Sequence, residues 1–207
     1  MKIGLIGKGF VGEAIYQNLR KQFEFLIYDI NESRKNVDHI RDVTHGAEVI
    51  FVALPTPMQE NGKCDLSIIF NCFNEISYWY KNNVIILKST VPPGTSKKIK
   101  SIHPELKIVF SPEFLTEANF VEDFKNSNRV ILGGETEDTM FCAQMFQKVF
   151  PNKNYLFTNH KTAETVKYFI NNFLATKVSF ANEMKEICDS IGVDYEDVKN
   201  LALYKKD

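Results

Sequence analysis

The opening stretch of the sequence places three closely spaced glycines directly after a short apolar run, and this combination strongly constrains the fold. Gly7, Gly9 and Gly12 have the spacing GxGxxG, and apolar residues recur at helical spacing after them. Between a strand and a helix, the first glycine permits a tight turn and the second lets a pyrophosphate approach the backbone. The third lets the helix pack closely against the strand. The segment therefore predicts a dinucleotide-binding unit.

A carboxylate follows the glycines at the distance that such a unit requires. Asp29 ends a second apolar run, about twenty residues after the glycine motif, where a carboxylate accepts both hydroxyls of an adenosine ribose. The same charge repels the 2′-phosphate of NADP. Arg34 could instead meet such a phosphate, but we expect Asp29 to dominate. The sequence thus predicts NAD as the cofactor.

Short apolar runs alternate with helix-length segments as far as residue 160. The predicted strands are Lys2–Gly7, Phe23–Tyr28, Glu48–Leu54, Val84–Leu87, Lys107–Phe110 and Arg129–Leu132. The third of them is apolar almost throughout, as expected for a strand buried on both faces. We therefore expect an α/β fold in which residues 1–160 form an NAD-binding Rossmann domain with a doubly wound, mostly parallel sheet.

The pattern changes to one long amphipathic helix from about Thr162 to Gly192. Apolar residues recur there at steps of three and four, without proline, over roughly 45 Å. A Rossmann domain alone cannot cover so long an apolar stripe, and large exposed apolar patches are rare in monomers. We expect residues 161–207 to form a connecting and dimerisation helix with the start of a central helical region, in a homodimer.

Composition and charge exclude several classes of protein. Of the 207 residues, 44% are hydrophobic and 25% are charged, and the formal net charge is −1, which disfavours disorder and nucleic-acid binding. No apolar stretch approaches the ~18 residues that span a bilayer, and no signal peptide is evident. The cysteines are widely spaced, which is typical of reduced thiols. We expect a soluble cytoplasmic protein without a metal site or membrane partner.

Three further motifs follow predicted strands, at the carboxyl ends where open α/β sheets bind ligands. They are ALPTP at 53–57, KSTVPPGT at 88–95 and SPEFLTE at 111–117. Together with RVILGG at 129–134 and AETVKYFINNFLA at 163–175, they closely resemble the nucleotide-sugar 6-dehydrogenases. The resemblance covers nearly the whole chain. The third motif contains the pattern EFLxE, which is similar to that of the UDP-glucose and GDP-mannose branches of the family rather than to that of the N-acetylmannosamine branch.

The resemblance implies an oxidation of the sugar's C6 alcohol to a carboxylate, with two hydride transfers to NAD. A covalent thioester on a cysteine stands between the two transfers. UDP-glucose is the expected substrate, and the product is then UDP-glucuronate for polysaccharide biosynthesis.

Catalytic roles follow from the resemblance at four matching positions. Glu113 matches the general acid/base that works on the water hydrolysing the thioester, and Thr90 helps to hold that water. Lys167 and Asn171 are four residues apart on one helix face, so both can stabilise an oxyanion at C6.

The resemblance also implies binding positions. Arg34 matches a basic residue beside the adenosine ribose, and Glu117 matches a position near the nicotinamide half of the cofactor. The expected cofactor-binding residues are Gly7, Gly9, Phe10, Val11, Gly12, Asp29, Arg34, Leu54, Thr56, Ser89, Thr90 and Glu117. The expected sugar-binding residues are Phe114, Leu115, Glu117, Lys167 and Asn171.

The chain departs from the family's pattern in two places. Only a short segment separates Asp29 from the strand near Glu48, where relatives carry a third strand, so we expect a more open adenosine side. Relatives also continue into a C-terminal nucleotide-binding domain that supplies the nucleophilic cysteine within a glycine-rich segment. We find no such segment and expect that domain to be absent, with Cys188 as a core thiol.

These departures leave alternatives open. The chain is the N-terminal half of a nucleotide-sugar dehydrogenase or a natural short form of one. It can also be an NAD-binding module without independent turnover that pairs with another subunit. A dehydrogenase of the 3-hydroxyacid or 6-phosphogluconate kind is a third reading. The pairs Glu113/Glu117 and Lys167/Asn171 argue against the third.

Overall fold

The computed structural model describes residues 1–203 of the chain. The chain divides into two compact units, Met1–Lys167 and a second that begins at Tyr168. Positions 204–207 of the expected C-terminal helical segment lie outside the described residues.

The first unit is built on one sheet in the order β2-β1-β3-β4-β5-β6-β7. Its strands are β1 (Lys2–Ile6), β2 (Glu24–Tyr28), β3 (Val49–Val52), β4 (Val84–Leu87), β5 (Lys107–Phe110), β6 (Arg129–Gly134) and β7 (Asn154–Thr158). Every neighbouring pair is parallel except β5 and β6. The predicted α/β fold with a mostly parallel sheet is confirmed.

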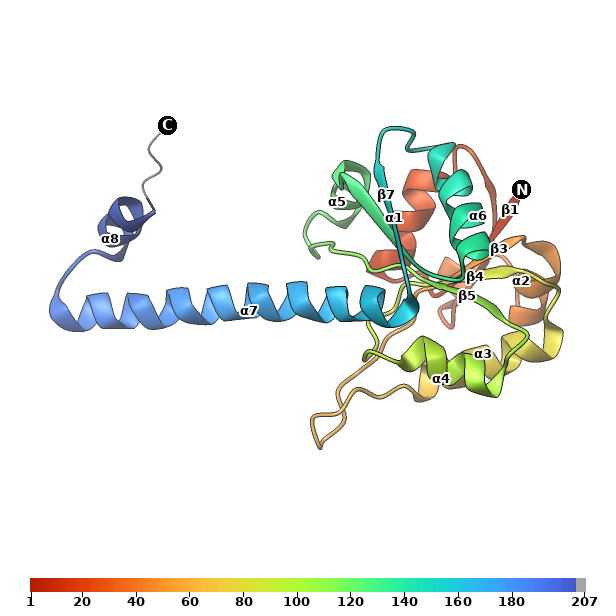
Figure 1. Ribbon diagram of the computed structural model, residues 1–207, viewed down its shortest axis with the longest axis horizontal. Coiled ribbons are helices and arrows are strands. Elements are labelled where there is room, and N and C mark those ends of the chain that lie inside the picture. Colours follow the sequence, from red (N-terminus) through yellow and green to blue (C-terminus); the bar gives the residue numbers. More distant parts are fainter. Residues whose placement is uncertain (204–207) are drawn as a thin grey trace. The chain divides into compact units, whose positions relative to one another are not determined.

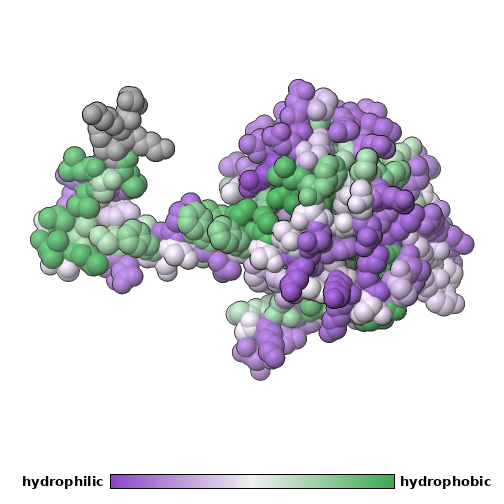
Figure 2. All heavy atoms as spheres, in the orientation of Figure 1, coloured by the Kyte–Doolittle hydropathy of each residue, from purple (hydrophilic) through white to green (hydrophobic). Residues whose placement is uncertain are grey.

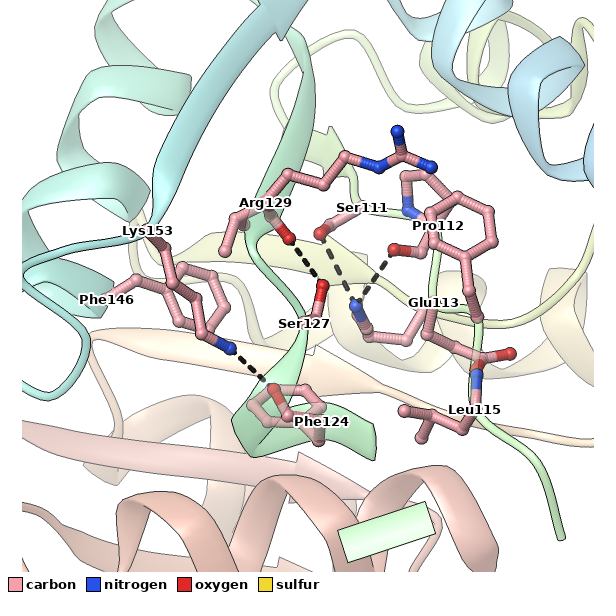
Figure 3. Close-up of a pocket in the computed structure, with 12 residues that line it drawn as sticks. Ser111, Pro112, Glu113, Leu115, Phe124, Ser127, Arg129, Phe146 and Lys153 are labelled. Atoms are coloured by element: carbon pink, nitrogen blue, oxygen red, sulfur yellow. Dashed lines mark hydrogen bonds between the residues drawn. The ribbon is translucent and has the colours of Figure 1, made fainter. Parts of the chain in front are cut away.

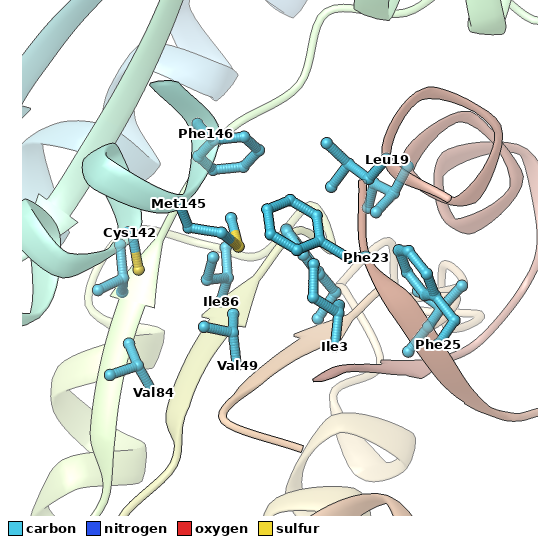
Figure 4. Close-up of a cluster of buried hydrophobic side chains, with 14 of the residues drawn as sticks. Ile3, Leu19, Phe23, Phe25, Val49, Val84, Ile86, Cys142, Met145 and Phe146 are labelled. Carbon is cyan, nitrogen blue, oxygen red and sulfur yellow. The ribbon is translucent and has the colours of Figure 1, made fainter. Parts of the chain in front are cut away.

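Helices cover both faces of this sheet (Figure 1). On one face lie α1 (Phe10–Leu19), α5 (Phe120–Asn126) and α6 (Thr136–Gln147), and on the other lie α2 (Ile40–Gly46), α3 (Ser67–Trp79) and α4 (Thr95–Ile102). Each face has its own buried apolar cluster. In the first cluster, the aromatic rings of Phe23 and Phe146 lie above β-strand residues such as Ile3 and Ile86 (Figure 4). Because both faces are buried, the central strands are apolar throughout.

Strand β7 was not predicted from the sequence. It pairs only with β6, and its Leu156 and Phe157 side chains are about half exposed. An edge strand of this kind lacks the continuous apolar run of a central strand, so it gives a weaker sequence signal.

No strand lies between β2 and β3 among the described residues, as the short connecting segment predicted. The segment forms a 3-10 turn at Glu32–Arg34 and helix α2. Asn36 instead covers the outer edge of β2: its side chain accepts from Ile27 N (2.6 Å) and donates to Phe25 O (2.9 Å). Its backbone N–H also donates to Ile27 O (3.0 Å). One asparagine thus satisfies edge groups that a further strand would pair with.

The second unit consists of the rest of α7 and the short helix α8 (Tyr195–Ala202). Helix α7 runs over His160–Ile191, which confirms the predicted long helix. Many apolar side chains on these helices are exposed, including Phe169 at 70% and Leu201 at 79%, and they form much of the visible surface of this unit (Figure 2). Cys188 is buried, as expected. None of the described helices is long and apolar enough to cross a membrane.

The asparagine at the sheet edge gives a first prediction. Replacing it in Asn36→Ala removes two side-chain hydrogen bonds to β2, and we expect a loss of about 1 kcal/mol in the free energy of unfolding. Urea unfolding measures this change. Asn71→Ala, at an exposed position on α3, is the matched control and should be neutral. Equal stabilities for the two variants would show that Asn36 does not hold the edge.

Candidate functional site

The glycine motif forms the turn between β1 and α1. Gly7 has φ +91°, a left-handed conformation that favours glycine, and a Cβ there would lie 2.4 Å from Ala53 O. A Cβ on Gly12 would lie 2.1 Å from Gly7 O, so the third glycine lets α1 approach the turn. The motif therefore has the close packing for which its glycines were singled out.

Asp29 joins the glycine turn to the end of β2. Its carboxylate is largely buried and accepts from the backbone amide of Lys8 (2.6 Å) and from that of Asn31 (2.8 Å). Each carboxylate oxygen has two lone pairs, so each keeps capacity for a further donor. Arg34 lies nearby on the exposed side, and its guanidinium makes no ion pair with any described residue.

A cavity of about 800 Å³ lies over the carboxyl ends of the parallel strands. Most of the expected cofactor positions line it, and so do two expected catalytic residues, Thr90 and Glu113. The expected residues on its wall are Gly7, Gly9, Phe10, Val11, Asp29, Arg34, Leu54, Thr56, Ser89, Thr90 and Glu113. Gly12 and Glu117 do not line this cavity, and Glu117 is exposed. Residues that the motifs did not single out, such as Tyr28, Ile30 and Ile68, also contribute to its wall.

Two of the lining hydroxyl groups hold neighbouring loops together. Ser89 Oγ, after β4, accepts from the backbone amide of Leu54, after β3 (2.8 Å). Thr56 Oγ1, also after β3, donates to Thr90 O, after β4 (2.8 Å). These side chains therefore fix the spacing of two loops at the cavity, a structural role that the motifs alone did not reveal.

Glu113 and Lys167 form a nearly buried ion pair. The ammonium lies 3.0 Å from Glu113 Oε1 and donates to Glu113 O (2.6 Å), and the two side chains are 11% and 7% exposed. Glu113 Oε2 accepts from Leu115 N (2.7 Å). The structure thus brings these two expected catalytic residues together, with Thr90 on the same cavity as Glu113. Asn171 belongs to the second unit.

The residues expected to contact the sugar have different surroundings. The ring of Phe114 is close to two cations, with Arg129 Cζ at 5.4 Å and Lys167 Nζ at 5.6 Å from its centroid. Leu115 packs against the first apolar cluster. The Phe114 and Leu115 side chains therefore already contact other parts of the protein.

Lys88 is a site residue that sequence reasoning missed as an individual. It directly follows the apolar strand β4, is 4% exposed, and lines the large cavity. Its ammonium donates to Ser111 Oγ at 3.4 Å and to Pro112 O at 3.5 Å, two long hydrogen bonds that end as dashed lines on the labelled Ser111 and Pro112 in Figure 3. It also lies 5.8 Å from the ring centroid of Phe124. Burial lowers its pKa to about 8, while the charge of Glu113 opposes this shift. A lysine at the end of a fully apolar strand was the available signal.

A second lysine lies on a smaller cavity of about 40 Å³ that Lys88 also lines. Lys153 Nζ donates to Phe124 O (2.5 Å) and stands 3.9 Å from the ring centroid of Phe150. Burial lowers the pKa of Lys153 to about 8 as well. The small cavity is therefore lined by Lys88, Arg129 and Lys153 and by one carboxylate, that of Glu113.

The buried lysine predicts a pH dependence of stability. Because its folded pKa of about 8 lies below the ordinary 10.5, the unfolded chain binds more protons between these pH values. The free energy of unfolding of the wild type, relative to Lys88→Met, should therefore rise as pH increases through this window. Urea unfolding at several pH values measures the difference. Lys97→Met, at an exposed position, is the control, and a flat difference for Lys88→Met would contradict the buried charge.

Comparison with known families agrees with this geometry. Residues 35–153 match the NAD-binding domain of the UDP-glucose/GDP-mannose dehydrogenase family, and residues 161–207 match the central domain of the same family.

Individual relatives extend the match. A UDP-glucose 6-dehydrogenase of Rickettsia bellii is 34% identical over 181 residues, which cover 83% of this chain and 41% of the relative. One from Rickettsia felis is 33% identical over an alignment of 238 residues, covering 96% of this chain and 52% of the relative. That alignment is longer than the 207-residue chain, so the relative has residues without a counterpart here. The chain spans about half or less of the length of the curated relatives it matches.

The fold is also that of solved structures. A UDP-glucose dehydrogenase from the archaeon Pyrobaculum islandicum is similar with a TM-score of 0.87 and 23% identity, over 98% of this chain and 56% of that chain. A GDP-mannose dehydrogenase from Pseudomonas aeruginosa, in a ternary complex, gives a TM-score of 0.86 and 20% identity, over 97% and 56%. On the match of both family domains, the chain belongs to the UDP-glucose/GDP-mannose dehydrogenase family and carries its NAD-binding domain.

Proposed function

We propose that the chain is the cofactor-binding half of an NAD-dependent nucleotide-sugar 6-dehydrogenase, with UDP-glucose as its substrate. One observation carries the proposal: the glycine turn, Asp29 and the Glu113 side chain all line a single cavity. A cofactor that spans this cavity would have its adenosine end at Asp29 and its reactive end near Glu113. Relatives named for UDP-glucose support the substrate over GDP-mannose.

The residues present fit NAD. A Cβ on Gly9 would meet no atom within 4 Å, so this side of the turn is open toward the cavity and leaves room for a pyrophosphate. The start of α1 follows Gly9 directly, and its free amides favour an anion. Asp29 would bind the ribose hydroxyls with the lone pairs that its backbone donors leave free. NAD would supply the hydride acceptor.

The chain's own catalytic contribution would come from the charged pair. The Lys167 ammonium would favour the ionised form of the Glu113 carboxylate. A general base must be ionised before it can take a proton from water in the cavity. The ammonium would also stabilise negative charge that develops on a sugar oxygen. We propose that Thr90 orients the water and that Asn171, one turn beyond Lys167, adds a hydrogen bond to the sugar. Phe114, Leu115 and Glu117 remain proposed sugar-binding positions.

A second candidate function is an NAD-binding module without independent turnover. None of the four cysteines, all of which lie in the described part of the chain, lines the large cavity. Burial also raises the pKa of the Cys72 and Cys142 thiols, which disfavours a reactive thiolate. This observation favours a partner or a further domain as the source of the nucleophile.

Cofactor choice is a direct test of the adenosine end. We expect NAD to bind more tightly than NADP, because the Asp29 carboxylate repels a 2′-phosphate. Asp29→Ala should weaken NAD about tenfold and narrow the difference between the cofactors, since it loses charged hydrogen bonds. Calorimetric titration with both cofactors measures this, with Arg34→Ala as the comparison. Tighter binding of NADP than of NAD by the wild type would reverse our assignment.

The chemistry is tested with the 207-residue chain itself. We expect it to bind NAD but not to convert UDP-glucose into UDP-glucuronate, because no cysteine lines its cavity to act as the nucleophile. NADH absorbance at high UDP-glucose concentration measures turnover. Release of two NADH per sugar, at about 1 s⁻¹ or faster, would mean that one of the four cysteines acts as the nucleophile. Cys188→Ser would then be the first variant to measure.

The exposed apolar side chains of the second unit support a homodimer. We propose that a second copy covers this face of α7 and α8. Light scattering at micromolar concentration should then give twice the mass of one chain. A monomeric mass, with the helix content retained in circular dichroism, would contradict this.

A further inference from the structure

The first turns of α7 carry three polar side chains that contact other elements of the first unit. His160 Nε2 donates to Ile108 O in β5 (2.7 Å), and Lys167 Nζ contacts Glu113. Glu164 lies between them. The spacing of four and then three residues places all three on one face of the helix. This face therefore attaches α7 to β5, to the start of α4 and to Glu113 in the candidate site.

Glu164 is the most deeply buried of the three. Its side chain is 0% exposed, and its carboxylate accepts from Gly94 N (2.5 Å) and from Ser96 N (2.8 Å). These amides lie at the start of α4, where a helix has unpaired N–H groups and a positive dipole end. The motif comparison assigned Glu164 no role. Its charge is compensated by α4 rather than by a cation.

The segment held by this carboxylate also forms the cavity wall. Between β4 and α4 the chain passes through Ser89 and Thr90, which line the large cavity, and ends at Gly94. Ser89 fixes one end of the segment to the loop after β3. Glu164 fixes the other end to α7. The cavity loop is thus held at both ends, at one end by the loop after β3 and at the other by α7.

We propose that Glu164 is a positioning residue for the candidate site. By binding the start of α4, Glu164 fixes α7 at this point. Lys167 lies about one helical turn further along α7, so the same contact places its ammonium against Glu113. The same contact holds Thr90 at the cavity. A role for Glu164 in catalysis rests on the proposed function. Its effects on Lys167 and on NAD binding can be measured without any enzymatic turnover.

A purely stabilising role for Glu164 makes different predictions. A buried carboxylate with two amide donors contributes to stability wherever it lies, and its loss costs stability without changing the site of a chain that still folds. A positioning role requires that the Lys167 ammonium and the cavity loop change while the fold persists. Two site readouts and one stability readout therefore separate the roles.

The experiment uses the 207-residue chain and three variants. Glu164→Gln keeps the shape of the side chain but loses the charge and presents an N–H₂ group to one backbone donor. Glu164→Asp keeps the charge and is one methylene shorter. Glu183→Gln, at an exposed position further along α7, is the matched control. Thermal unfolding first shows which variants fold.

The first site readout is the side-chain ammonium signal of Lys167 in a proton–nitrogen NMR spectrum, identified by its loss in Lys167→Met. The second is the dissociation constant for NAD. Glu164→Gln should shift or broaden the Lys167 signal and weaken NAD at least about fivefold, since the amides lose a charged acceptor. Glu164→Asp should recover part of both effects. Glu183→Gln should match the wild type.

Two results would overturn the proposal. One is a folded Glu164→Gln chain whose Lys167 signal and NAD affinity equal those of the wild type, even if it melts at a lower temperature. If Glu164→Gln does not fold, unchanged readouts in a folded Glu164→Asp chain have the same force. A wild type that fails to bind NAD would count against the proposed function, and the Lys167 signal alone would then decide the role of Glu164.

Discussion

Parallel pairing of β2, β1, β3, β4 and β5 brings the carboxyl ends of five strands to one edge of the sheet. The segments that follow these ends supply, in sheet order, Asp29, Gly7, Leu54, Ser89 and Glu113. Residues that are far apart in sequence therefore line one cavity because of how the strands pair. The remaining features of the site, including the loop ties and the helix contacts, adjust distances within an arrangement that strand pairing has already made.

The site also contains buried charged side chains, and these side chains differ in how their charge is compensated. Glu113 faces the Lys167 ammonium, and Glu164 faces the backbone amides at the start of α4. The Lys88 ammonium donates to a hydroxyl and a carbonyl over long distances and makes no ion pair with a described residue, and its burial lowers its pKa. Groups with perturbed pKa values in a cleft often mark functional sites. Here the perturbed lysine lines the same cavity as the proposed acid/base, Glu113.

Much of the fold could be predicted because its signals are local. Each central strand is an apolar run, and the glycine motif requires a turn between a strand and a helix, so the strand bounds were close to those observed. The strand β7 was missed because it is half exposed at the sheet edge. Covering of the β2 edge by Asn36 could not be predicted either, since a single asparagine side chain leaves no periodic pattern.

Residues of the candidate site could be predicted from the sequence only where they belong to a recognisable motif. The motifs indicated Glu113 and Lys167, and the structure shows that the two side chains touch. The motifs could not show that Ser89 and Thr56 tie loops together, because hydrogen-bond partners depend on the spacing of β3 and β4. No motif assigns a role to Glu164. Its role depends on α4, which is distant in sequence and reaches it only through the fold.

The central claim is that the cavity at the strand ends is the NAD site. Backbone amide shifts of the isotope-labelled chain, followed while NAD is added, test this directly. The account predicts that the largest changes fall in the glycine turn, at Asp29 and in the loop with Ser89 and Thr90. It predicts smaller changes in β7, which contributes no residue to this cavity. Saturating NAD that leaves the glycine turn unchanged, or that moves residues of β7 most, would contradict the account.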